Sequence, residues 1–132
     1  MIRILLAEKD QNIRSSIKQI IAEFPGIDIT GEVSDTIALH NLLNQHTFDI
    51  LLLDTGLKNK GGVKLISEIT AQYPELPVVA LSMHREPQFL DTCFTEGASG
   101  YLIKTELSEE LVDAVKIVLG GKKYTSANII HK

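Results

Sequence analysis

The chain is 132 residues long, with 44% hydrophobic and 23% charged residues, a balance that excludes a disordered tail and fits one globular domain with a core. Its 17 acidic and 13 basic side chains give a formal charge of -4, which disfavours direct binding to a nucleic-acid backbone. No apolar run approaches the ~18 residues of a membrane span, and no signal-peptide pattern follows Met1, so we expect a cytoplasmic protein without a membrane partner.

Five short apolar runs predict β-strands, at residues 2–7, 27–33, 50–53, 78–81 and 101–103. Four of these runs are nearly continuous in Ile, Leu and Val, which is typical of parallel strands covered on both faces. The run at 27–33 instead alternates apolar and polar residues, as a strand at the edge of a sheet does. The pattern therefore predicts a parallel sheet with the second strand at its rim.

Between the strands, apolar residues recur at the spacing of a helix, which predicts five helices. Asp10 stands before the first of them as a favoured N-cap, while Pro87 and Gly97 suit the start and the end of the fourth. Ser108 is the expected N-cap of the fifth helix, which the glycines at 120–121 end. A chain of βα units with right-handed crossovers predicts an α/β fold, an open, doubly wound sheet with helices on both faces.

A polar residue follows or closes four of the predicted strands, namely Glu8, Asp54, Ser82 and Lys104. Ligands of open α/β sheets bind beyond the carboxyl ends of the strands, so these side chains are predicted to share one crevice. There a carboxylate can attack phosphorus and form an acyl phosphate, while a lysine and magnesium offset the charge of the phosphoryl oxygens. Each residue alone has an ordinary structural explanation, but a scaffold does not require all of them at equivalent positions.

The stretches that carry these residues resemble the receiver domain of bacterial two-component response regulators, at 2–8, 48–54, 76–82 and 97–104. The agreement extends to their order and spacing and covers almost the whole chain. The chain resembles in particular the receivers that precede a LuxR-like (NarL/FixJ-type) DNA-binding domain. The resemblance implies a flavodoxin-like sheet of five strands in the order 2-1-3-4-5. It also implies a receiver domain over residues 1–121 and, at 122–132, the start of a linker toward a helix-turn-helix output domain.

By the same resemblance, Asp54 accepts a phosphoryl group from a phosphohistidine of a sensor histidine kinase, and Lys104 contacts that group. Ser82 then hydrogen-bonds the phosphoryl group and Tyr101 changes rotamer, so the domain acts as a switch and not as a conventional enzyme. The expected partners are the kinase and a second copy of the chain, which would bind through the fourth helix, fifth strand and fifth helix. DNA would be bound only by the output domain.

The magnesium site departs from the family pattern. The resemblance places Glu8, the Asp54 carboxylate and the Gly56 carbonyl at ligand positions, but Lys9 stands where the family normally has a second acid. We therefore expect a reduced affinity for Mg²⁺, although one or two carboxylates with waters are often enough for this ion. A second departure is Lys58, at a position where many family members have proline, and we expect this lysine to be solvated.

Two alternatives stay open. In a pseudo-receiver, Lys9 pairs with Asp54 and the domain works independently of phosphorylation, as a dimerisation or docking module. In a small hydrolase, Asp54 acts as the nucleophile, but Gly56 stands where a general acid would be placed. The hydrolase therefore has the weaker support.

Overall fold

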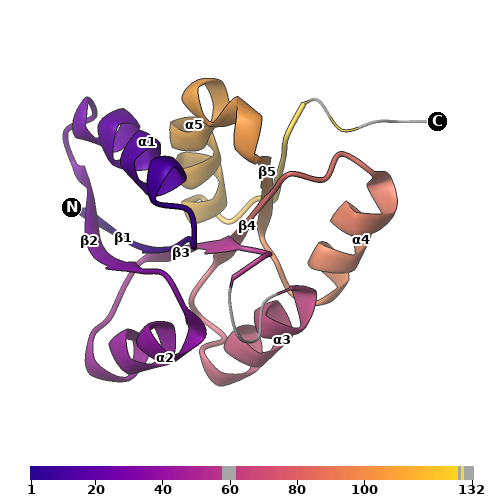
Figure 1. Cartoon of the computed structure of the whole chain (residues 1–132), viewed down its shortest axis with the longest axis horizontal. Helices are drawn as coiled ribbons and strands as arrows, with labels where there is room; N and C mark the ends of the chain where they lie inside the picture. Colours follow the sequence, from indigo (N-terminus) through magenta and orange to yellow (C-terminus); the bar gives the residue numbers. More distant parts are fainter. Residues whose placement is uncertain (58–61, 128, 130–132) are drawn as a thin grey trace.

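Strands and helices alternate along the chain (Figure 1). The computed structural model describes residues 1–57, 62–127 and 129, so Lys58 lies outside the described residues. The strands are β1 (Ile2–Ala7), β2 (Ile27–Val33), β3 (Ile50–Asp54), β4 (Val78–Ser82), β5 (Gly100–Ile103) and β6 (Tyr124–Thr125). The α-helices are α1 (Gln11–Ala22), α2 (Thr36–Gln45), α3 (Val63–Gln72), α4 (Pro87–Thr95) and α5 (Leu107–Leu119). A 3₁₀ turn over Lys104–Glu106 joins β5 to α5.

The strands form one parallel sheet in the order β2-β1-β3-β4-β5-β6. The predicted order of the first five strands and the edge position of β2 are confirmed. The predicted number of strands is wrong, because the sheet has six strands and β6 adds to the far side of β5. This strand is only two residues long and lies in the segment 122–132 that was expected to begin a linker. Such a short run carries no hydrophobic periodicity, so sequence patterns do not reveal it.

Helices cover both faces of the sheet, as predicted (Figure 1). Residues of β1 alternate between two cores, because successive side chains of a strand point to opposite faces. Ile4 and Leu6 belong to a cluster that includes buried residues of α1 and α5. Leu5 and Ala7 belong to the other cluster, with residues of α2, α3 and α4. The four residues are fully buried, which fixes the register of the central strands.

Most helix ends lie where the sequence predicts them. The Asp10 side chain caps α1 and accepts a hydrogen bond of 2.8 Å from the amide of Asn12. Pro87 opens α4, and Gly97 follows its end with a φ of +116°, a conformation that favours glycine. The predicted N-cap of α5 is wrong: this helix begins at Leu107, before Ser108, because the preceding 3₁₀ turn already leads the chain into helical geometry.

Among the described residues, no helix has the length and the apolar character needed to cross a bilayer.

Candidate functional site

The carboxyl ends of β1, β3, β4 and β5 meet at one edge of the sheet. Glu8 follows β1, Asp54 ends β3, Ser82 ends β4 and Lys104 follows β5. The first three residues are nearly inaccessible to solvent, with exposed fractions of 0%, 1% and 1%. Parallel strands place these side chains at the same edge, as the sequence predicts.

One ammonium group joins two buried carboxylates at this edge. The Nζ atom of Lys104 lies 2.7 Å from Oδ1 of Asp54 and 3.0 Å from Oε1 of Glu8. The Lys104 side chain is only 7% exposed. Two negative charges therefore share one positive charge away from water, an arrangement that favours a further cation.

Backbone amides hold the Asp54 carboxylate from two loops. The Gly56 amide donates to Oδ1 over 2.8 Å, and the Lys9 amide donates to Oδ2 over 3.2 Å. Oδ1 also accepts the hydrogen bond from Lys104. These donors fix the orientation of the carboxylate, and Oδ2 is the less engaged of its two oxygens.

The two carboxyl groups have opposite pKa shifts. Burial works against ionisation of Asp54, but the hydrogen bonds from Lys104 and Gly56 and the charge of Lys104 outweigh burial and lower its pKa below the ordinary value of 3.8. Burial raises the pKa of Glu8 above its ordinary value of 4.5, although the Asp10 amide and Lys104 oppose this shift. Asp54 is therefore the carboxylate that stays ionised and available as a nucleophile.

Comparison with known proteins decides the family. The family described as "Response regulator receiver domain" matches this sequence over residues 4–116. The chain belongs to this family. Receiver domains are signalling modules and not classical enzymes, and they generally bind Mg²⁺ at an acidic site.

Relatives of this receiver include a transcriptional regulatory protein and a response regulator. The transcriptional regulatory protein DegU of Brevibacillus brevis is 28% identical over 130 residues, which cover 98% of this chain and 55% of DegU. The response regulator UvrY of Escherichia coli (strain K12) is 26% identical over 132 residues, which cover 100% of this chain and 61% of UvrY. The chain thus spans 55% to 61% of the length of these two curated relatives.

Solved structures agree with the fold. A two-component response regulator of the LuxR family from Aurantimonas sp. SI85-9A1 matches with a TM-score of 0.89 and 28% identity, over 96% of this chain and 91% of that one. The non-phosphorylated receiver domain of RcsB from Escherichia coli matches with a TM-score of 0.88 and 23% identity, over 95% and 98% of the two chains.

The donor set of this receiver fits a magnesium ion. Oε1 of Glu8 is buried and, apart from its ion pair with Lys104, accepts no hydrogen bond from the described part of the chain. The Asp54 carboxylate and the Gly56 backbone are adjacent, and Mg²⁺ prefers such hard oxygen donors. In the residues that the structure describes, no group of three or more acidic, His or Cys side chains surrounds a metal position. The acidic set is therefore reduced to two carboxylates, Glu8 and Asp54.

Lys9 lies at the rim of this crevice. Its ammonium Nζ is 3.0 Å from the position that a Cβ atom on residue Gly56 would occupy. No ion pair joins Lys9 to Asp54 among the described residues, and the only hydrogen bond between the two comes from the Lys9 backbone. The expected contact of Lys9 with Asp54 is therefore made by its amide, whereas its positive charge stands beside Gly56.

Ser82 and Tyr101 are linked through a residue that the sequence did not suggest. The Ser82 hydroxyl accepts a hydrogen bond of 3.0 Å from the His84 amide, and the Tyr101 hydroxyl donates one of 2.8 Å to the His84 carbonyl. Tyr101 is fully buried, and burial raises the pKa of its hydroxyl to about 12, so it remains a donor. His84 belongs to no sequence motif. Only its position two residues after Ser82 in the sequence could have suggested its role.

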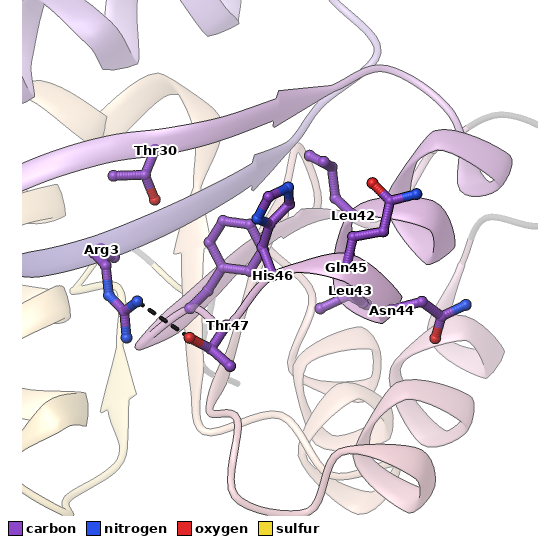
Figure 2. A pocket seen from close by; sticks show the side chains of 9 residues that line it. Arg3, Thr30, Leu42, Leu43, Asn44, Gln45, His46 and Thr47 are labelled. Carbon is purple, nitrogen blue, oxygen red and sulfur yellow. Dashed lines mark hydrogen bonds between the residues drawn. The ribbon is translucent and has the colours of Figure 1, made fainter.

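A second hollow lies at the opposite, amino-terminal end of the sheet (Figure 2). Its volume of about 570 Å³ exceeds the 430 Å³ of the crevice at Asp54. Figure 2 shows Arg3 and Thr47 on its wall, joined by a hydrogen bond of 3.1 Å. The Arg3 side chain is 45% exposed, so its charge stays hydrated. This hollow holds no buried charge in the described residues and offers no comparable chemistry.

Proposed function

We propose that this receiver accepts a phosphoryl group on Asp54 from a phosphohistidine of a sensor histidine kinase and thereby controls a transcription-regulating output domain. The observation that carries the proposal is the buried Asp54 carboxylate, whose Oδ1 lies 2.7 Å from Nζ of Lys104. An ionised carboxylate is the form that can act as a nucleophile on phosphorus.

The transfer needs little covalent chemistry from the protein. A carboxylate oxygen of Asp54 bonds to phosphorus, the P–N bond of the phosphohistidine breaks, and its electron pair returns to the leaving imidazole. We assign the attack to Oδ2, because Oδ1 already accepts the hydrogen bonds from Lys104 and Gly56. The Lys104 ammonium then lies beside the new acyl phosphate and offsets its charge.

Glu8, the Asp54 carboxylate and the Gly56 carbonyl would hold Mg²⁺, which supplies further neutralisation of the phosphoryl oxygens when it is bound. Lys9 reduces the affinity for this ion, because a positive charge at the rim of the crevice repels the cation.

The change at Asp54 would reach the surface through Ser82. When the Ser82 hydroxyl turns to a phosphoryl oxygen, it gives up its hydrogen bond with the His84 amide. The His84 carbonyl accepts a hydrogen bond from the Tyr101 hydroxyl, so a movement of the His84 backbone would weaken the hydrogen bond that holds the Tyr101 rotamer. We place the response at α4, β5 and α5, where a second copy of the chain would bind. DNA binding would belong to an output domain after residue 132, as the greater length of DegU and UvrY suggests.

One observation favours a phosphorylation-independent pseudo-receiver, namely the Lys9 ammonium beside Gly56. In that case the lysine would take the place of the cation permanently, and the crevice would ignore phosphate analogues.

Titration with beryllofluoride and Mg²⁺, followed by amide NMR, tests the proposal. We expect shifts around Asp54, Ser82 and Tyr101 in the wild type, none in Asp54→Asn, and a saturation at lower Mg²⁺ concentration, by about tenfold, in Lys9→Asp. Lys116→Asp makes the same charge change at an exposed position of α5 and serves as the control. A silent wild type together with a responsive Lys9→Asp would establish the pseudo-receiver instead.

A further inference from the structure

The chain after α5 completes the sheet along the outer edge of β5. In Figure 1 the yellow C-terminal segment runs beside β5, between α5 and α4. The Tyr124 amide donates to the Ser99 carbonyl over 3.1 Å, and the Ser126 amide donates to the Tyr101 carbonyl over 2.9 Å. The Ile103 amide donates over 3.0 Å to the hydroxyl of Ser126, which stands in for a backbone carbonyl. The edge of β5 is thus paired by the chain itself.

This segment is also anchored on the α5 side. The Tyr124 hydroxyl donates to Oε1 of Glu110 over 2.8 Å, and the Ala127 amide donates to Oε2 of the same carboxylate over 3.4 Å. Glu110 is only 9% exposed, which is unusual for a glutamate unless its oxygens are paired. Without the segment, this carboxylate would lose both of these donors.

A second anchor lies on the α4 side. Ile129 is 6% exposed and belongs to the same apolar cluster as Cys93, Tyr101 and Ile103. The Lys123 ammonium lies 5.3 Å from the centre of the Phe94 ring, a cation–π contact with α4. The segment therefore bridges the two helices that flank β5.

We propose that residues 123–127 and Ile129 form a C-terminal strap that occupies the edge of β5 and excludes a second copy of the chain from the α4–β5–α5 face. The unpaired edge of a sheet is a template for pairing with another chain, and proteins cover such edges when they stay monomeric. The proposal goes beyond the proposed phosphoryl transfer and does not depend on it.

The partner that the bare edge fits is a second copy. In a two-fold contact the same face meets itself, so opposite charges must lie on one face. Exposed acids at Glu109 and Asp113 on α5 and the exposed Lys122, which directly precedes the strap, supply this pattern. The strap is displaceable, because its ladder with β5 is only two residue pairs long.

The strap also holds β5 at the residues next to the site. Its hydrogen bonds with β5 itself join Tyr101 and Ile103, and Ile103 directly precedes Lys104, the partner of Asp54. Release of the strap therefore removes hydrogen bonds at Tyr101 and Ile103, next to the site at Lys104.

The full 132-residue chain serves for the test, as the wild type and as the double variant Ser126→Ala/Ile129→Asp. Thr125→Ala is the control, because its exposed side chain lies in the same strand. We expect the Ile103 amide of the double variant to exchange with deuterium about tenfold faster than in the wild type. We also expect its monomer–dimer equilibrium, measured by sedimentation velocity, to shift about tenfold toward the dimer. The control should match the wild type in both measurements.

Two results would overturn the proposal. One is an unchanged exchange rate at Ile103, which would mean that the strap does not protect β5. The other is a faster exchange without any gain in dimer, which would mean that the strap excludes no second copy. If circular dichroism shows that the double variant does not fold, Tyr124→Phe, which removes only the bond to Glu110, replaces it with the same two readouts.

Discussion

The two ends of the sheet differ in how deeply they bury charged side chains. The crevice at the carboxyl ends buries Glu8 and Asp54 almost completely against one lysine. The larger hollow at the amino ends is lined by Arg3 (Figure 2). The Arg3 side chain is 45% exposed and pairs with the Asp49 side chain, which is 36% exposed. A buried charge is costly, so buried charged groups are found where they are paired or belong to a functional site. Charge burial, and not volume, therefore distinguishes the functional end of the sheet.

The largest effect is expected when the crevice loses the ammonium group of Lys104. Lys104→Met leaves two buried carboxylates without their ammonium partner. Removal of one partner from a buried ion pair typically costs about 3–5 kcal/mol, and we expect a loss of this size in the free energy of unfolding at pH 7. Urea denaturation in the presence of EDTA measures it, because a bound divalent cation would mask the loss.

Lys116→Met is the matched control for this loss, since Lys116 is exposed on α5 and should change stability by less than about 0.5 kcal/mol. The cost of Lys104→Met should shrink as the pH falls and the carboxyl groups take up protons. Equal, small effects of the two variants would show that the crevice is hydrated like the amino end.

Smaller changes in the free energy of unfolding are expected when the two carboxyl groups are substituted, and the changes have opposite signs. The pKa of Asp54 is lowered, so its ionised form stabilises the fold above the ordinary value of 3.8, and this gain is lost as the pH falls through the folded-state pKa. The pKa of Glu8 is raised, so its charge costs stability once the pH rises above 4.5, most fully above the folded-state pKa.

At pH 7, Asp54→Asn should therefore lower the free energy of unfolding and Glu8→Gln should raise it, each by about 1 kcal/mol. Both differences should disappear at a pH low enough to protonate the wild-type groups. Urea denaturation between pH 3 and pH 7 gives both curves. If the two substitutions change stability in the same direction at pH 7, the assignment of a lowered pKa to Asp54 and a raised pKa to Glu8 is wrong.

Most of the fold follows from patterns that the sequence carries locally. Long apolar runs define the central strands, and Asp10, Pro87 and Gly97 mark helix ends through their own backbone chemistry. β6 could not be predicted, because two residues acquire strand geometry only from the neighbouring edge of β5. The predicted N-cap at Ser108 is wrong for a related reason, since the turn that precedes α5 decides where the helix begins.

The candidate site was predictable where topology alone brings residues together. Glu8, Asp54 and Lys104 stand at strand ends, so a parallel sheet gathers them. The orientation of Lys9 was not predictable, because a flexible side chain at a rim is placed by its surroundings and not by spacing. His84 was missed since its contribution comes from backbone atoms, which every residue has.

The smallest effect is expected at the amino end. Arg3→Gln removes the contact of 3.5 Å between the guanidinium and Asp49 and the hydrogen bond to Thr47. Exposed ion pairs of this kind contribute at most about 1 kcal/mol, and we expect a loss near the lower end of that range. The pKa of Asp49 should stay below its ordinary value, because the hydrogen bond from the backbone amide of residue 3 is the main cause of its shift and survives the substitution. An NMR titration of the Asp49 carboxyl group checks this, and a return of its pKa to the ordinary value of 3.8 would show that the side chain and not the backbone controls this end of the sheet.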